Sequence, residues 1–127
     1  MPFLFLRKDE VLKLHARVLE LFGGTHGLRD EGALESALAA VENRKHYENA
    51  DLATCAATYA YHLSQAHAFV DGNKRIAAHA SGAFLGLNDA ELTATDEQVI
   101  ELFIKIAAGE LSRDCVEQFF KRWVVVH

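Results

Sequence analysis

The sequence predicts an all-α protein, a single domain over residues 1–127 that forms a bundle of about six helices. Apolar residues recur at helical spacing along nearly the whole chain. The predicted helices are separated by short breaks that contain glycine, asparagine or aspartate. The 127 residues, half of them hydrophobic, suit one compact domain with its own core.

The first predicted helix covers residues 8–22, because apolar side chains lie on one face and charged ones on the other. Its apolar face consists of Val11, Leu14, Val18 and Leu21. A second helix follows Asp30, a candidate N-cap, and fades near Asn43. Its apolar residues are Leu34, Leu38 and Val41. The polar and aromatic residues 43–50 are predicted to be a connection.

A third helix is expected from Asp51 to about Ala66, and it carries almost no charge on any face. Such a helix is typical of an element buried at the centre of a domain. A fourth helix begins near Lys74, after a glycine-containing break, and ends at Asn88. Its inward residues are expected to be Ile76, Ala80, Ala83, Phe84 and Leu87.

Residues 95–98 form a capping box that opens a fifth helix, which Gly109 ends. Its apolar residues are Val99, Phe103, Ile104 and Ala107. Ser112 is expected to cap the last helix, whose apolar residues are Val116, Phe119, Phe120 and Trp123. Two short strands are expected, at residues 91–94 and 124–126.

The composition limits the partners and the compartment. A formal charge of -5 argues against a surface devoted to nucleic acid, so no direct nucleic-acid partner is expected. The longest charge-free stretch, residues 52–70, is too polar for a membrane span, and the N-terminus lacks the features of a signal peptide. Cys55 and Cys115 are expected to be two buried thiols. We therefore expect a soluble cytoplasmic protein without membrane association.

One segment, His67 to Arg75, combines three chemical features where the fourth helix begins. Free backbone N–H groups after Gly72 predict an anion site at the helix N-terminus. Lys74 and Arg75 stand at this positive end of the helix dipole, which is unfavourable unless a multiply charged anion lies between them. His67 and Asp71 add a candidate base and a ligand for a hard cation. The combination favours nucleotide chemistry.

Each of these residues alone has an ordinary structural explanation. His67 suits the end of a buried helix, residues 71–73 suit a turn, and Lys74 and Arg75 suit a solvated surface. Their coincidence at one junction of an otherwise apolar region favours a functional site.

The stretch HAFVDGNKR resembles the signature of the Fic/Doc family, HxFx(D/E/N)(G/A)N(G/K)R, at every fixed position. The segments LHARVLELFGG, GLRDEGALESALA and AAGELS are also similar to stand-alone Doc-type proteins. The resemblance implies the fold of that family, a small helical bundle with the motif in a loop between two central helices.

The resemblance also implies roles for the motif residues. His67 matches the general base that takes the proton from a target hydroxyl, and Asp71 matches the residue that holds Mg²⁺ on the phosphates of ATP. Gly72 and Asn73 match the turn that cradles the phosphates, and Arg75 matches the arginine that binds phosphate oxygens.

Two departures from the adenylyl-transferring members point to the Doc branch. Lys74 replaces the glycine that many of them have, and Ala78 stands where a second arginine often follows. The implied function is a growth-arresting toxin that transfers the γ-phosphoryl group of ATP to a hydroxyl of a protein, with translation elongation factor Tu as the family's target. The alternative within the family is transfer of AMP, and Lys74 is expected to disfavour that placement of the nucleotide.

The sequence contains no match to the family's inhibitory motif, (S/T)xxxE(G/N). An active toxin without an internal inhibitor implies an external one, a small antitoxin protein. A different class of function is a non-catalytic module whose basic helix end docks an acidic partner. Such docking needs neither the base His67 nor the metal ligand Asp71.

Other residues are weaker candidates. Phe69 matches the aromatic that anchors the motif loop in the core. His62 is a candidate for lining the site, while His79 is expected to face solvent rather than a phosphate. Arg29 is a candidate for contact with a protein target, because the family's docking flap lies in its region. Four histidines are expected to be surface or packing residues, His15, His26, His46 and His127. The aromatic stripe of the last helix is expected in the core.

Overall fold

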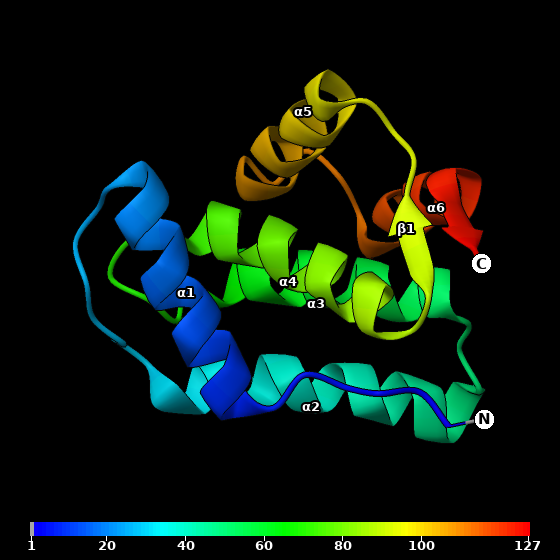
Figure 1. Ribbon diagram of the computed structural model, residues 1–127, viewed down its shortest axis with the longest axis horizontal. Helices are drawn as coiled ribbons and strands as arrows, with labels where there is room; N and C mark the ends of the chain where they lie inside the picture. The colour runs from blue at the N-terminus through cyan, green and yellow to red at the C-terminus, as the bar shows by residue number, and fades with distance from the viewer. Residues whose placement is uncertain (1) are drawn as a thin grey trace.

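The computed structural model describes residues 2–127 and confirms the all-α prediction (Figure 1). Within that range the helices are α1 (Lys8–Phe22), α2 (Glu31–Glu48), α3 (Leu52–Ala66), α4 (Asn73–Leu87), α5 (Asp96–Ala107) and α6 (Arg113–Trp123). Two short strands, β1 (Ala90–Leu92) and β2 (Val124–Val126), pair antiparallel with Ala90 opposite Val126. The two predicted strand regions are therefore confirmed, although the first covers residues 90–92 rather than 91–94.

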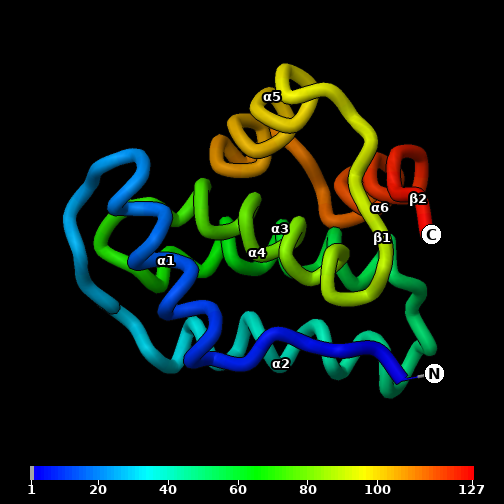
Figure 2. The backbone as a smooth tube through the Cα atoms, in the orientation of Figure 1, coloured from blue at the N-terminus to red at the C-terminus, as the bar shows by residue number. Residues whose placement is uncertain are grey.

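The central position of α3 is confirmed. This helix packs against α2, α4, α5 and α6, and ten of its fifteen residues are buried. In Figure 2, α3 and α4 run side by side through the middle of the molecule, with α2 on one side and α5 and α6 on the other. A helix surrounded in this way cannot hold charged side chains without burying them, which explains its uncharged sequence.

The predicted N-caps Asp30, Asp51, Thr95 and Ser112 are confirmed, because each side chain accepts a bond from a backbone N–H of its helix. Asp51, for example, accepts from the Thr54 N–H at 2.8 Å. The N-terminus of α4 differs, since its N-cap is Gly72 and no side chain caps it. The free N–H groups of the first turn of α4 are therefore left for other partners.

The prediction that residues 43–50 form a connection is wrong, because α2 continues to Glu48. Arg44 explains the extra turn. Its guanidinium forms an ion pair with the Glu48 carboxylate on the same helix at 2.7 Å, and it donates a hydrogen bond to the Glu117 carboxylate on α6 at 2.5 Å. The polar residues at the end of α2 thus make contacts between helices, and the helix ends only at Asn49, which has a left-handed φ of 50°.

Several predicted core positions are also wrong. In α1, Leu21 is exposed and His15 is buried, because the His15 ring packs on the loop that precedes α4. In α5, Ile104 is exposed and Ala107 lies on the surface, and the inner residues are Leu102, Phe103 and Ile106. Leu87 and Cys115 are exposed as well. The periodicity located these helices correctly but misjudged the inward-facing side.

Among residues 2–127, no helix combines the length and the apolar character needed to cross a membrane. The buried core is instead shared among the helices, with Tyr59 of α3, Phe84 of α4 and Phe120 of α6 as its largest fully buried side chains. The α3–α4 pair at its centre positions the segment His67 to Arg75, which joins the two helices.

Candidate active site

The motif loop, residues 67–72, joins α3 to α4, as the resemblance implied. His67 is the C-cap of α3 and Gly72 the N-cap of α4, and both have left-handed backbone, with φ of 47° and 76°. The two residues between which the chain reverses are therefore fixed in conformations that most residues avoid. A Cβ on Gly72 would lie 3.3 Å from the Leu19 side chain and 3.4 Å from the His15 ring, so a residue without a side chain suits this position.

Two buried aromatic side chains anchor the motif loop. Phe69 is buried, as predicted, and the His15 ring stacks on it with 3.7 Å between ring centroids. The His15 Nε2–H donates to the carbonyl oxygen of Asp71 at 2.8 Å. His15 is thus a packing residue with a specific partner, and its only signal in the sequence is a polar side chain at helical spacing from Val11 and Val18.

Asn73 closes the motif loop from its far end. Its side-chain amide donates to the Phe69 carbonyl at 2.9 Å and accepts from the Phe69 N–H at 3.0 Å. These bonds hold the side-chain amide against the motif loop, and the backbone N–H of Asn73 has no intrahelical acceptor at the start of α4. The N–H groups of Lys74 and Arg75 follow it in the first turn of α4, where no intrahelical acceptor exists.

A second segment, which we call the flap (residues 23–30), runs along the motif loop. Leu28 and Phe69 form an antiparallel bridge. The Arg29 and Asp30 N–H groups donate to the Ala68 carbonyl at 2.7 and 2.9 Å, and the Val70 N–H donates to the Gly27 carbonyl at 3.0 Å. The backbone of the flap and that of the motif loop therefore form one hydrogen-bonded unit.

Asp71 is exposed, and backbone donors hold its carboxylate. The Thr25 N–H of the flap donates to Oδ2 at 3.1 Å, and the Gly72 N–H donates to Oδ1 at 2.9 Å. These two bonds hold the pKa of Asp71 below its ordinary value, so the carboxylate is ionised at neutral pH. Gly24 is close to the same group, since a Cβ there would lie 2.9 Å from Oδ2.

His67 has an exposed side chain, and its backbone carbonyl accepts a bond from the Arg29 guanidinium at 2.7 Å. Arg29 thus has a polar partner within the chain, and its contact with a protein target stays a prediction. His67 and Asp71 lie at the two ends of the motif loop, and the flap contacts both.

A cleft of about 960 Å³ opens beside the first turn of α4 and extends between α4 and α5. Lys74 and Arg75 line one part of it, and the Arg75 guanidinium lies 4.2 Å from the centroid of the Phe22 ring. His79 and the acidic Asp96 also line it, and most of the other lining side chains are small or apolar, including Ala78, Gly82, Ala83, Val99, Ile100, Phe103 and Ile104. The exposed isoleucines of α5 thus face a space that is cationic beside the first turn of α4 and mostly apolar along its length.

The two further histidine candidates lie in different places. His79 is exposed, as predicted, and it lines the cleft with 5.7 Å between its ring centroid and that of Phe22. Burial and the nearby Arg75 charge lower its pKa, so its neutral form is favoured. His62 does not line the cleft, and burial and the positive charges of Arg113 and Arg44 lower its pKa.

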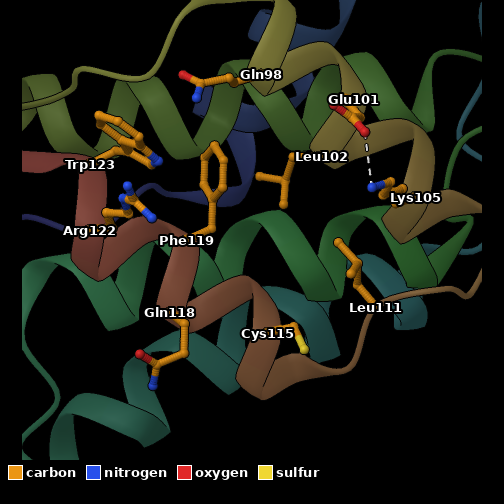
Figure 3. A pocket seen from close by; sticks show the side chains of 10 residues that line it. All are labelled: Gln98, Glu101, Leu102, Lys105, Leu111, Cys115, Gln118, Phe119, Arg122 and Trp123. Carbon is orange, nitrogen blue, oxygen red and sulfur yellow. Dashed lines mark ion pairs between the residues drawn. The ribbon is translucent and has the colours of Figure 1, made fainter.

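A second cavity of about 490 Å³ lies between α5 and α6 (Figure 3). Phe119 and Trp123 line it and are only half-buried, so of the predicted aromatic core stripe only Phe120 is fully buried. Glu101 and Lys105 form an ion pair at its edge at 2.9 Å, and the exposed Cys115 lies at its other side. This cavity contains no residue of the motif loop or the flap.

The described residues contain no group of three or more histidine, cysteine, aspartate or glutamate side chains able to hold a metal ion. A cation at Asp71 would therefore need further oxygen ligands, of the kind that nucleotide phosphates and water supply. The exposed, ionised carboxylate of Asp71 fits that arrangement, because Mg²⁺ binds through one or two carboxylates together with phosphate oxygens.

Comparison with known proteins identifies a matching family and a similar protein. The model of the Fic/DOC family matches residues 5–85, more than half of the chain. The chain is also 31% identical over 115 residues to the protein named "Protein kinase doc" of Escherichia phage P1, a match that covers 90% of each protein. The family match contains α1 to α3, the flap, the motif loop and most of α4, which together hold every motif residue described above.

Proposed function

The chain belongs to the Fic/Doc family, and on that premise we propose that it is a Doc-type toxin that transfers the γ-phosphoryl group of ATP to a hydroxyl of a target protein. One observation carries the proposal. An exposed histidine and an ionised carboxylate lie in the loop that leads directly into the uncapped cationic N-terminus of α4, and Lys74 and Arg75 of that N-terminus line a cleft of about 960 Å³. These are the groups that phosphoryl transfer requires, a base, a metal ligand and phosphate donors.

In this proposal the N-terminus of α4 binds the phosphates. The N–H groups of Asn73, Lys74 and Arg75 lack intrahelical acceptors and coincide with the positive end of the helix dipole. The Arg75 guanidinium adds a planar donor for two phosphate oxygens, and the Lys74 ammonium adds a compact charge. A multiply charged anion explains why two cations stand at the end of a helix that ordinarily disfavours them.

His67 acts as the general base. Its imidazole, in the neutral form, takes the proton of the target hydroxyl while that oxygen attacks the γ-phosphorus. The bond from the γ-phosphorus to its bridging oxygen breaks, and ADP leaves with the electron pair. The position of His67 at the exposed end of the motif loop suits a base that must reach a hydroxyl on another protein.

Asp71 would hold Mg²⁺ on the phosphates. The cation, when bound, would supply positive charge to the phosphate oxygens. The contribution of the chain is a carboxylate kept ionised and oriented by the backbone of Thr25 and Gly72. The apolar part of the cleft between α4 and α5 then suits the remainder of the nucleotide, which presents a flat ring system.

The partners proposed are a protein substrate, with elongation factor Tu as the first candidate, and a small antitoxin. Expression of the chain alone in bacteria should arrest growth, and the His67→Ala variant should not. Arrest that persists in this variant would favour the non-catalytic module that docks an acidic partner.

The experiment that tests the proposal uses ATP labelled separately at the α- and γ-phosphates. Wild-type protein and Mg²⁺ are incubated with purified elongation factor Tu and, in parallel, with a cell extract. We expect γ-label, and no α-label, on the target. Deposition of α-label would establish adenylyl transfer instead, and no label on any protein would contradict a transferase function.

The Lys74→Gly variant is the matched control for the direction of transfer. Glycine leaves open the space that the lysine fills and removes a charge that attracts phosphate oxygens. We expect this variant to lose most γ-phosphoryl transfer. Unchanged γ-transfer would mean that Lys74 does not set the placement of the nucleotide.

A further inference from the structure

The backbone of His67 is held in an unfavourable conformation. Its φ of 47° and ψ of 40° place it in the left-handed region, where a Cβ crowds the following carbonyl oxygen. A residue other than glycine keeps such a conformation only where its surroundings determine it. The contacts that keep the backbone of residue 67 in this conformation therefore also set the direction in which its side chain leaves the backbone.

The polar contact that His67 makes with the rest of the chain is through its carbonyl. Among the described residues no group donates to or accepts from its exposed imidazole, whereas the carbonyl oxygen accepts from Arg29 Nη2 at 2.7 Å. A charged donor makes this a strong bond. Because nothing holds the ring directly, the position of the imidazole depends on the backbone that carries it.

Arg29 is itself well placed to act as a restraint. Its own N–H donates to the Ala68 carbonyl at 2.7 Å, and the next residue, Asp30, donates to the same oxygen and caps α2 through the Ala33 N–H at 2.9 Å. The backbone of Arg29 is thus fixed at the start of a long helix. In the described residues its guanidinium pairs with no carboxylate, and the His67 carbonyl is its polar partner.

We propose that Arg29 is a positioning residue for the transfer reaction, whose guanidinium holds the His67 carbonyl and thereby keeps the imidazole where it acts as the base. This inference rests on the proposed function. Arg29 touches neither the reacting atoms nor the cleft, so its effect is on the geometry of the base rather than on nucleotide binding.

The structure allows this role to be tested without disturbing the fold. The side chain of Arg29 is exposed, and the bonds that join the flap to Ala68 use only backbone atoms. The Arg29→Ala variant therefore removes the bond to His67 and leaves the bridge intact. Arg29→Lys keeps a cationic donor, and Arg17→Ala removes another exposed arginine, which pairs with Glu20 on α1 at 3.2 Å.

The experiment measures kcat and KM for both substrates in the wild type and the three variants, together with the midpoint of thermal unfolding. We expect Arg29→Ala to lower kcat by about 100-fold, the size of effect that a small misplacement of a reacting group produces. The KM for ATP and the unfolding midpoint should stay close to those of the wild type. Arg29→Lys should restore most of the loss, and Arg17→Ala should match the wild type.

Two kinetic results would overturn the inference. An unchanged kcat in Arg29→Ala would show that the bond does not position the base. A raised KM for the protein target with normal kcat would assign Arg29 to target binding instead.

A second measurement does not depend on transfer activity. The one-bond coupling between Cα and Hα separates positive from negative φ, and we expect the positive φ of His67 in the wild type to be lost in Arg29→Ala. A positive φ that persists in Arg29→Ala would overturn the inference. If φ changes but the wild type transfers no phosphate, the restraint stands and the proposed function fails.

Discussion

The cleft between α4 and α5 and the cavity between α5 and α6 share α5 as a wall but differ in their helix ends and charges. Beside the cleft, α4 begins at Gly72 with no capping side chain. Beside the cavity, α6 begins at Ser112, whose hydroxyl accepts from the Cys115 N–H at 3.2 Å. Lys74 and Arg75 have no carboxylate partner among the described residues, while Lys105 of the cavity pairs with Glu101.

This difference shows which features distinguish a ligand site from a gap between helices. In the cavity, Ser112 caps the start of α6 and Lys105 is paired with Glu101, whereas Arg122 has no carboxylate partner among the described residues and lies 5.0 Å from the centroid of the Trp123 ring. An arginine beside an aromatic ring therefore occurs in both places. The cleft differs in its uncapped helix N-terminus and its unpaired lysine, which are groups that an anion can use. Volume alone does not separate the two, because both can hold a small molecule.

The largest expected effect is at His67. The His67→Ala variant should lose about 10²- to 10⁴-fold in transfer rate, the usual consequence of removing a general base. Its unfolding midpoint should remain near that of the wild type, because the side chain is exposed. His46→Ala, an exposed histidine on α2, is the control and should keep full activity. Near-normal transfer by the His67 variant would remove it from the mechanism.

Asp71→Asn should abolish the dependence of ATP binding on Mg²⁺. The amide keeps the shape of the side chain but lacks the negative charge that a hard cation prefers. Calorimetric titration with ATP, with and without Mg²⁺, measures the effect. Equal enhancement by Mg²⁺ in the wild type and the variant would show that Asp71 is not the metal ligand.

Gly72→Ala tests the shape of the motif loop. Left-handed backbone costs a residue with a Cβ about 1–2 kcal/mol, and here the Cβ also contacts Leu19 and His15. Gly109→Ala is a matched control, since Gly109 has a φ of 74° and no atom within 4 Å of its Cβ position. Urea denaturation should show a larger loss of stability for Gly72→Ala. Equal losses would mean that the contacts of a Cβ at residue 72 with Leu19 and His15 do not affect stability.

The stability of the protein at acid pH should depend on the hydrogen bonds that the Asp71 carboxylate accepts. They hold its folded-state pKa below the ordinary value of 3.8, so the charged form stabilises the fold above that pH. This contribution is lost as the pH falls through the lower folded-state pKa. We expect wild-type stability to fall more steeply than that of Asp71→Asn below about pH 4. Parallel curves from thermal denaturation at several pH values would contradict this.

The smallest expected effect is in the cavity between α5 and α6. The double variant Lys105→Met, Arg122→Gln should leave the KM for ATP and kcat unchanged, because neither residue touches the motif loop or the cleft. Arg75→Gln, made in parallel, should raise the KM for ATP. A raised KM in the double variant would place part of the nucleotide site in this cavity.

The sequence predicted the parts of the fold that depend on neighbouring residues. Helix starts at Asp51 and Thr95 were correct because an N-cap acts within one turn. The central position of α3 was predicted correctly because a helix without charged residues has no polar face suited to solvent. The extension of α2 was missed because it depends on Arg44 meeting Glu117, which lies 73 residues further along the chain.

The candidate site shows the same limit. The motif placed His67 and Asp71 at one junction, since they lie only four residues apart. The bonds that hold them come from Thr25, Arg29 and His15, which belong to the flap and to α1. No local pattern marks these partners, because each acts through a contact that only the folded chain creates.

The central claim is that the uncapped end of α4 and the adjacent cleft bind the nucleotide, and that the cavity between α5 and α6 does not. The most direct test is titration of ¹⁵N-labelled protein with Mg-ATP, followed by amide chemical shifts. We expect the largest changes at Asn73, Lys74 and Arg75, with further changes along the cleft. Changes centred on Cys115, Phe119 and Trp123 instead, or no saturable change at the start of α4, would contradict the claim.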